Sequence, residues 1–343
     1  MIKIENQKMI VELPKMDNRQ QLFFKNLSLS EKLTYIETFN GKRKHIYPNR
    51  FKRTGPDKLA GRQVGHYARM MNSLCDGNKT FNPKQSDFHF GVEIECFIPK
   101  NEGDESCDYC NEEGDSEECS CGYETDNQIR NRFLKHLTTR KIKNVSIKYD
   151  GSIQCSRSNW AVEFTVLVNT KDWSNLKKLC ELLAENNAKV NKTCGLHVHL
   201  DARTLDKKTL RQKARNFGKS LGVLKLMVPE SRRINTYCQM GVSKLNGTRY
   251  YAVNLTSYSK YKTLEVRLHS GTTNFEKIYN WCTILKSIYD APVKTFPKIV
   301  VDVNDLSGIV NENNLEYMQQ RIDYFNGNLT MSQYSDNDLA TAA

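Results

Sequence analysis

The sequence predicts an α+β fold in which helices cover one face of an antiparallel sheet and the other face stays open. Four segments alternate apolar and polar residues with the period of two that is typical of a half-buried strand. Amphipathic helical patterns lie between them. Antiparallel sheets with one covered and one open face have this pattern. The four segments are Phe88–Ile98, Ala161–Val168, Cys194–Asp201 and Leu264–His269.

The open face of this predicted sheet collects ionisable side chains. In Cys194–Asp201, the side chains of His197, His199 and Asp201 share the face opposite three apolar residues. The same alternation places four carboxylates on the polar faces of the other strands, namely Glu93, Glu95, Glu163 and Glu265. So many negative charges are tolerable only beside cations or with raised pKa values. A divalent metal ion is the simplest remedy.

The strand Leu264–His269 adds two further basic groups to this prediction. Strict alternation places Arg267 and His269 on the same open face as Glu265. The side chains of Leu264 and Leu268 should then point to the helix-covered face.

The other elements follow in chain order. A short N-terminal helix is expected at Leu29–Phe39, with Ser28 or Ser30 as its N-cap. Further helices are expected at Asn127–Arg140, Trp173–Ala188, Lys207–Met227 and Asn274–Pro292, and further strands at Val145–Tyr149, Arg249–Thr256 and Lys262–His269. Asp150-Gly-Ser152 is a common hairpin signal, so Asp150 is either a turn former or a site residue.

Composition favours a reduced, cytoplasmic protein without a membrane partner. No apolar run approaches the roughly 18–20 residues that a membrane span needs. The first residues lack the apolar core of a signal peptide. The eleven cysteines are odd in number and scattered, which argues against a disulfide scaffold.

Charge is distributed unevenly and suggests the domain boundaries. Residues 40–84 hold eleven Lys and Arg against two Asp, a net charge of +9, whereas residues 101–126 hold eleven Asp and Glu and no Lys or Arg. Both blocks look like additions to a core. We therefore expect a basic N-terminal region at 1–86, a core domain at 87–300 that contains the acidic insert, and a polar, peripheral or frayed tail at 301–343.

The basic block at residues 40–84 has two readings. Lys and Arg are interleaved there with residues such as Tyr47, Phe51 and Tyr67, a pattern that suits phosphate contact and base stacking. The block can equally be a solvated basic arm or a segment packed on the protein's own acidic surface. Nucleic acid or another polyanion is the candidate partner.

The acidic insert carries two pairs of cysteines with the spacing C-x2-C-x8-C-x-C. Reduced thiols at this spacing match a small tetrahedral zinc knuckle, and the insert has little apolar core of its own. A disordered loop with incidental cysteines, or redox-active thiols, are the alternatives. The candidate structural Zn²⁺ ligands are Cys107, Cys110, Cys119 and Cys121.

The ordered set of motifs resembles the glutamine-synthetase-like carboxylate–amine ligases, and most closely the phage and bacterial amidoligase group. Gly195-Leu-His-Val-His-Leu-Asp201 and Glu265-Val-Arg-Leu-His-Ser-Gly-Thr272, before a Trp-bearing helix, contribute most to the resemblance. The other motifs, in order, are Gly91-Val-Glu93-Ile-Glu95, Asp150-Gly-Ser152 and Glu163. Each motif is weak alone, but five in register are specific. The resemblance covers roughly residues 87–295, and implies host cytoplasm if the chain is phage-encoded.

This resemblance implies a curved, mostly antiparallel sheet with helices on its convex face and ATP with Mg²⁺ or Mn²⁺ on its concave face. By the same resemblance, Glu93 would share one metal with His197 and Glu265, and Glu95 would share another with Glu163. Further implied roles are a transferred-phosphoryl contact for Arg267, help at the second metal from Asp150, a substrate-orienting role for His199, and phosphate or substrate contacts for Arg249 and Asn254.

The implied activity is formation of an amide from a carboxylate and an amine, either of which could be part of a peptide or protein. ATP would first convert the carboxylate into an acyl phosphate, which the amine then attacks. Two other classes stay open. The chain could be a nucleic-acid-binding or structural protein on an inactive ligase-like fold, or a metal-dependent phosphohydrolase that uses the same ligands.

Overall fold

The computed structural model describes residues 2–5, 8–11, 87–102 and 123–327. The chain divides into two compact units, residues 1–62 and 63–343. In the first unit, β1 (Ile2–Glu5) and β2 (Lys8–Val11) pair as an antiparallel hairpin. The predicted helix Leu29–Phe39, the basic block, the four cysteines of the insert and the end of the tail lie outside the described residues.

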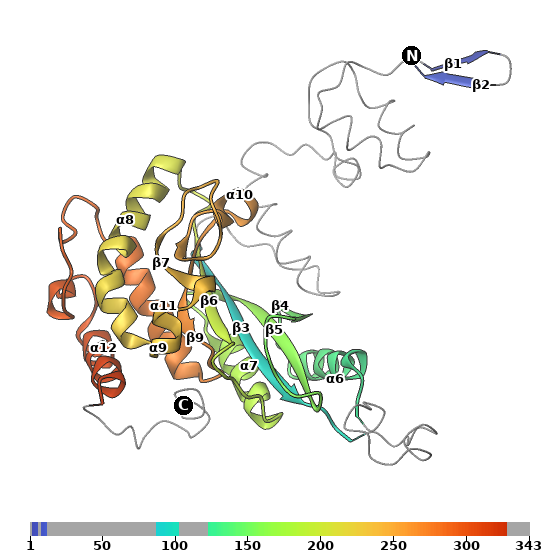
Figure 1. The fold of residues 1–343 in the computed structure, drawn as a ribbon, viewed down its shortest axis with the longest axis horizontal. Coiled ribbons are helices and arrows are strands. Elements are labelled where there is room, and N and C mark those ends of the chain that lie inside the picture. The colour runs from blue at the N-terminus through green and yellow to red at the C-terminus, as the bar shows by residue number, and fades with distance from the viewer. Residues whose placement is uncertain (1, 6–7, 12–86, 103–122, 328–343) are drawn as a thin grey trace. The chain divides into compact units, whose positions relative to one another are not determined.

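The second unit is built on a seven-stranded sheet in the order β4-β5-β3-β6-β9-β8-β7 (Figure 1). Its strands are β3 (His89–Pro99), β4 (Val145–Tyr149), β5 (Asn159–Asn169), β6 (Gly195–Asp201), β7 (Gln239–Val242), β8 (Tyr251–Asn254) and β9 (Thr263–Ser270). All neighbouring strands are antiparallel except β7 and β8, which are parallel. This confirms the predicted α+β class with a mostly antiparallel sheet. Strand β7 was not predicted from the sequence.

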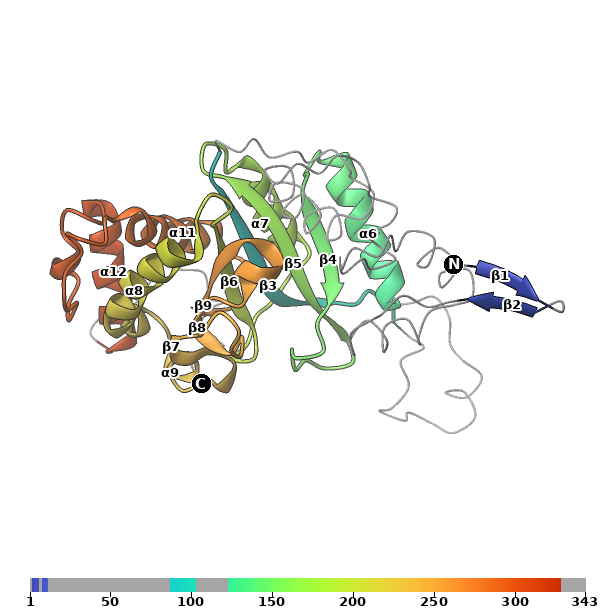
Figure 2. The same cartoon turned by 90° about the horizontal axis from the view of Figure 1, so that it is seen from above.

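Helices cover one face of the sheet (Figure 2). The main ones are α6 (Asp126–Thr139), α7 (Ser174–Glu185), α8 (Lys207–Leu224), α11 (Phe275–Asp290) and α12 (Glu312–Phe325). Aromatic side chains join the two layers. Phe133 of α6 meets Phe164 of β5 with ring centroids 5.2 Å apart, and Phe90 of β3 meets Trp173 at 5.5 Å. The apolar side chains of the alternating strands are buried in this layer.

The helices begin where capping residues allow it. Thr125 forms a reciprocal capping box with Gln128 at the start of α6, and the side chain of Asp206 accepts from the Thr209 amide at the start of α8. Asn274 caps α11 in the same way. Shorter helical turns lie at η1 (Lys225–Met227), α9 (Glu230–Arg233), η2 (Thr236–Cys238), α10 (Ser257–Tyr261) and η3 (Asn304–Leu306).

The segment after residue 300 differs from the prediction of a peripheral or frayed tail. Asn311 caps α12, and the side chains of Met318 and Ile322 are buried in the core. Burial of these apolar side chains fixes the helix against its neighbours, although its overall composition is polar.

A register shift between β6 and β9 corrects one prediction from strict alternation. Leu196 pairs with His269 but Val198 pairs with Val266, so β9 has an extra residue between these pairs. Such a bulge changes which face the following side chains take. His269 was predicted on the open face but lies on the helix-covered face, with its ring 5.0 Å from the ring of Trp281 on α11. Burial and nearby cationic groups, first Arg321, lower its pKa to about 3.

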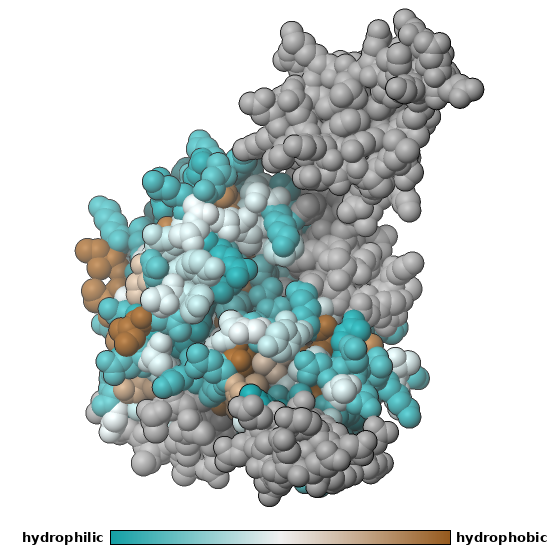
Figure 3. Space-filling view, turned by 45° about the vertical axis from the view of Figure 1, so that its right-hand side comes forward, coloured by the Kyte–Doolittle hydropathy of each residue, from teal (hydrophilic) through white to brown (hydrophobic). Residues whose placement is uncertain are grey.

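The described surface gives no sign of a membrane span. In the ranges that the structure describes, no helix is long and apolar enough to cross a bilayer. On the face shown in Figure 3, hydrophilic residues predominate and the hydrophobic patches are small and separate.

Candidate metal and phosphoryl site

One cavity on the open face brings together the ten residues predicted as catalytic, phosphate-binding or Mg²⁺/Mn²⁺ ligands. Asp201 was also predicted on this face but does not line the cavity, and its carboxylate accepts from Arg203 Nη2 at 2.6 Å instead. The cavity has a volume of about 540 Å³. Its lining includes Glu93, Glu95, Asp150, Glu163, His197, His199, Arg249, Asn254, Glu265 and Arg267. The four cysteines predicted to bind zinc lie outside the described residues.

Strand register explains why these side chains converge. Glu93 on β3 pairs with His197 on β6, and Glu95 on β3 pairs with Glu163 on β5. Residues directly opposite each other on antiparallel strands direct their side chains to the same face, with Cβ atoms about 5 Å apart. Three central strands therefore deliver one layer of carboxylates and imidazoles.

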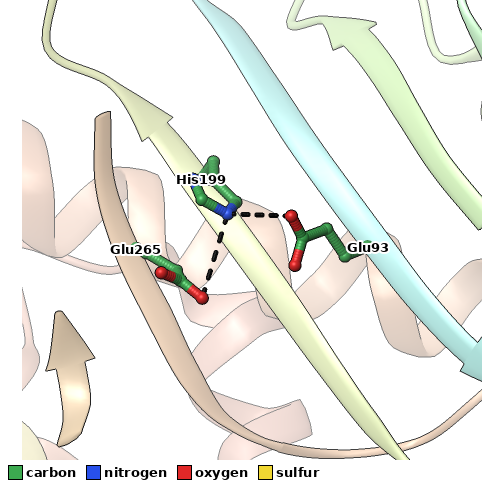
Figure 4. A group of neighbouring side chains, drawn as sticks. All are labelled: Glu93, His199 and Glu265. Atoms are coloured by element: carbon green, nitrogen blue, oxygen red, sulfur yellow. Dashed lines mark ion pairs between the residues drawn. The ribbon is translucent and has the colours of Figure 1, made fainter. Parts of the chain in front are cut away.

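A first group of potential metal ligands consists of Glu93, His199 and Glu265 (Figure 4). One ligand atom from each lies within 4.8 Å of the others. The His199 Nε2 atom is 3.2 Å from Glu93 Oε1 and 3.9 Å from Glu265 Oε1. It is buried and has no hydrogen-bond partner within the described ranges. The other ring nitrogen, Nδ1, is 2.8 Å from the Thr263 hydroxyl.

This arrangement requires a positive charge between the two carboxylates. With Nδ1 protonated toward Thr263, a neutral His199 would direct its Nε2 lone pair at two carboxylates. Burial opposes protonation, but Glu93 and Glu265 outweigh it and raise the pKa of His199. A proton on Nε2 can meet the requirement, and so can a metal ion bound by all three side chains.

A second group of potential ligands consists of Glu95, Asp150 and Glu163. Glu95 is held in place because its Oε2 accepts a hydrogen bond of 2.6 Å from the Gly195 amide. Asp150 accepts hydrogen bonds from the Ser152 amide and hydroxyl, so it is both a turn former and a member of the cluster.

Glu163 has an unusual environment within this second group. Burial and the negative charge of Glu93 raise its pKa to about 7, although Lys148 lies 3.2 Å away and opposes the shift. A buried carboxyl group with a raised pKa beside a second carboxylate is stabilised by a nearby positive charge. This is the condition that favours a bound cation.

His197 lies between the two groups. Its Nδ1 is 3.1 Å from Glu93 Oε2, and its Nε2 is 3.4 Å from Glu95 Oε1. The resemblance placed His197 with Glu93 and Glu265 at one metal, whereas in this geometry His199 is grouped with these two carboxylates. The assignment of either histidine as a ligand stays a prediction.

Arg267 and Asn254 both contact Glu265. The Arg267 Nη1 donates to Glu265 Oε1 at 2.5 Å, and the Asn254 side-chain amide donates to Oε2 at 2.6 Å. Burial lowers the pKa of Arg267 but Glu265 more than offsets this, so the guanidinium stays charged. Arg249 lies at the cavity lining, with its guanidinium 5.5 Å from the ring centre of Tyr250.

Two lining residues, Arg232 and Lys148, were missed by sequence reasoning. The buried Arg232 lies in the last turn of the short helix α9, in a polar segment without hydrophobic periodicity, so no local signal marks it. Its Nη2 donates to the Arg267 carbonyl oxygen at 2.5 Å, and its Nε to that of Leu268 at 3.4 Å, which holds the β9 bulge. Lys148 was detectable, because alternation along β4 places it on the face of Glu163.

The close packing around Arg232 also accounts for Gly195. A Cβ atom at this position would be 2.9 Å from His197 Nε2 and 3.1 Å from Arg232 Nη2. Any side chain larger than hydrogen would displace groups of the site.

Comparison with known protein families finds a match for this part of the chain. A family model with the description "putative amidoligase enzyme" matches the chain over residues 86–246. This segment is similar to the amidoligase family. The match confirms the resemblance seen in the sequence and supports a ligase-type enzyme. The matched segment contains Glu93, Glu95, Asp150, Glu163, His197 and His199, while Glu265 and Arg267 follow it. A comparison with curated proteins finds no match.

Proposed function

We propose that this protein is an ATP-dependent carboxylate–amine ligase that forms an amide through an acyl-phosphate intermediate. One observation carries the proposal. Two groups of potential metal ligands, Glu93–His199–Glu265 and Glu95–Asp150–Glu163, line the same cavity as the guanidinium of Arg267. Adjacent divalent cations beside an arginine suit phosphoryl transfer, where catalysis is mainly positioning and neutralisation of charge.

The donor set fits Mg²⁺ or Mn²⁺. Carboxylate oxygens predominate, as hard divalent cations prefer, and the buried His199 Nε2 adds one nitrogen ligand that Mn²⁺ accepts readily. When bound, such cations would neutralise the triphosphate oxygens of ATP. Within the described residues, both groups of potential metal ligands lie on the open face, and the helix-covered side has none.

The proposed reaction has two steps, and the first depends on Arg267. An oxygen of the substrate carboxylate attacks the γ-phosphorus of ATP, and ADP leaves. The charged Arg267 stabilises the negative charge on the transferred phosphoryl group. The amine nitrogen next attacks the acyl carbon, the bond to the phosphate oxygen breaks, and the amine proton passes to the released phosphate or to solvent.

Neighbouring residues would support these steps. Asn254 fixes the orientation of Glu265 through its hydrogen bond, and Arg232 fixes the backbone of Arg267. Arg249 is placed to contact a phosphate or an anionic substrate at the cavity lining. Support of this kind keeps ligand side chains in one geometry.

The remaining parts of the proposal come from the sequence alone. A curved, glutamine-synthetase-like sheet, a structural Zn²⁺ at Cys107, Cys110, Cys119 and Cys121, a polyanion contact through residues 40–84 and a cytoplasmic location stay predictions. The identities of the acid and the amine, which could be part of a peptide or protein, also stay open.

Amine-dependent release of ADP is the test of this function. The full chain is incubated with ATP, Mg²⁺ or Mn²⁺ and pooled acids and amines, and mass spectrometry searches for condensed products. Glu95→Gln and Arg267→Met should each abolish amine-dependent ADP release, whereas Glu181→Gln on the exposed surface of α7 should not.

Two outcomes would contradict the ligase proposal. Full activity in the Glu95 or Arg267 variant would remove these residues from the reaction. Metal-dependent phosphate release from ATP, with no condensed product and no response to amines, would favour a phosphohydrolase at the same site.

A further inference from the structure

Helix α8 (Figure 1) carries a row of exposed basic side chains. Its 18 residues include six Lys and Arg and no Asp or Glu. Every exposed residue of the helix is lysine, arginine or glycine. The exposed basic residues are Lys207, Lys208, Arg211 and Arg215, and the exposed Lys225 follows the end of the helix; these five form what we call the basic strip.

Helical geometry aligns the basic strip on one side of α8. At about 100° of rotation per residue, its members fall within an arc of roughly 100°. At about 1.5 Å of rise per residue, the strip extends over roughly 27 Å. Gly218 and Gly222 occupy the same arc between Arg215 and Lys225. A Cβ at Gly218 would lie 3.3 Å from Val242 Cγ2, and a Cβ at Gly222 would lie 3.5 Å from the Val300 carbonyl oxygen, so the arc is in contact with the protein at these two positions.

The basic strip has few acidic neighbours within the described part of the protein, although Asp206, the N-cap of α8, interacts with Lys208. None of its five side chains forms a salt bridge there, whereas Asp290, on the neighbouring helix α11, pairs with Lys286. Like charges four residues apart, as in Lys207, Arg211 and Arg215, destabilise a helix. A solvated face that served only solubility would intersperse acidic residues.

The two other cations of α8 are used differently. Lys213 donates to the Asp290 carbonyl oxygen at 3.1 Å, and Lys219 lies 5.5 Å from the ring centre of Phe296. These flanking side chains pack on the protein itself, which separates them from the basic strip.

We propose that the basic strip binds the phosphate backbone of double-helical nucleic acid. Duplex DNA carries one charge per about 1.7 Å, so roughly 27 Å of strip faces a dense row of phosphates. The exposed residues of α8 include no apolar side chain to insert into a membrane, and no aromatic side chain to anchor a protein partner or to stack on unpaired bases. The exposed Ile299 and Val301 flank Val300 near Gly222, so binding to vesicles is one outcome of the test below. This binding is independent of the proposed ligase activity.

Salt-dependent binding of a duplex tests the inference on the full chain. The probe is a random-sequence DNA duplex of about 30 base pairs, followed by fluorescence anisotropy between about 50 and 200 mM salt. A strip variant carries Lys207→Gln, Lys208→Gln, Arg211→Gln and Arg215→Gln. A matched control carries the same charge change at exposed lysines elsewhere: Lys135→Gln, Lys143→Gln, Lys177→Gln and Lys178→Gln.

The strip variant should lower the slope of log affinity against log salt by about 3 to 4, because each phosphate contact contributes about 0.9. The control should change the slope by less than about 1. Equal slopes in the two variants, or no duplex binding by the unmodified protein, would overturn the inference. So would strip-dependent binding to phosphatidylserine-rich vesicles that is as tight as binding to DNA.

Folding of the strip variant is checked by circular dichroism and thermal unfolding. Relief of like-charge repulsion should leave its Tm unchanged or raised. If the fourfold variant does not fold, the single variants Arg211→Gln and Arg215→Gln decide the question, since each should lower the salt slope by about 1. Unchanged slopes in both would also overturn the inference.

Discussion

Replacing Glu163 by glutamine should stabilise the metal-free protein at alkaline pH. The structure raises the pKa of Glu163 from 4.5 to about 7, through burial and the charge of Glu93. The folded protein therefore holds a proton that the unfolded chain releases. Below about pH 4.5, Glu163 is protonated in both states and does not affect the free energy of unfolding. This free energy falls as pH rises from about 4.5 to about 7, and above about 7 the folded protein is destabilised by the full cost of burying the ionised Glu163 carboxylate.

The size of the effect follows from the shift. About 2.5 pKa units at roughly 1.4 kcal/mol each give about 3 kcal/mol at pH 8. For a domain of this size, each kcal/mol changes Tm by roughly 2 °C or more. We therefore expect Glu163→Gln to raise Tm by roughly 6 °C at pH 8 in EDTA, and to have much less effect at pH 5, where Glu163 is mostly protonated.

Thermal unfolding with and without cations is the assay. Glu181→Gln, on the exposed surface of α7, should change stability by less than about 0.5 kcal/mol at either pH. Saturating Mn²⁺ should stabilise the unmodified protein, by about 2.7 kcal/mol at a hundred times its Kd, and Glu163→Gln much less. A variant at Glu163 that is destabilised at pH 8, or that responds to Mn²⁺ like the unmodified protein, would refute the reasoning.

Three further predictions concern the surroundings of the two ligand groups. Gly195→Ala should abolish ligase activity and metal binding, because its Cβ would be 2.9 Å from His197 Nε2; activity equal to that of the unmodified protein would contradict the close packing. Arg232→Met should release the β9 bulge and lower kcat. When Arg267 is already replaced by Met, the same change should lower kcat little further. Additive losses of kcat in this double-mutant cycle would argue against coupling between the two residues. The His199 ring should titrate by NMR above its usual pKa of 6.5 in EDTA and should stop titrating in Mg²⁺; a titration unaffected by Mg²⁺ would exclude it as a ligand.

The open face of the sheet was predictable because alternation is a local property of a strand. Side chains two residues apart share a face whatever the rest of the chain does, so Glu93 and Glu95, or His197 and His199, could be grouped from the sequence. The same rule places Lys148 on the open face, beside Glu163. The family match over residues 86–246 covers four of the five motifs on which the resemblance depends, and the Glu265–Thr272 motif lies beyond it.

The β9 bulge was not predictable, because it depends on pairing with β6 and leaves no local pattern. It removed His269 from the open face and left Arg267 on it. Arg232 was missed for a related reason, since its role is to donate to carbonyl oxygens of a strand far along the sequence. The grouping of His199 with Glu93 also depends on side-chain geometry that alternation alone does not determine.

Helix α12 shows a different kind of error. Leu315, Met318 and Ile322 have helical spacing, and Asn311 is a strong N-cap residue, so the helix was readable from the sequence. Its polar composition obscured this pattern. Burial of one apolar stripe is sufficient to hold a mostly polar helix in place.

The central claim is that two divalent cations bind side by side on the open face of the sheet. Anomalous diffraction from crystals grown with Mn²⁺ and a non-hydrolysable ATP analogue tests it most directly. We predict one peak among Glu93, His199 and Glu265 and a second beside Glu95 and Glu163, with the triphosphate between them and Arg267. No anomalous peak in this cavity, with the analogue bound elsewhere or not at all, would contradict the account.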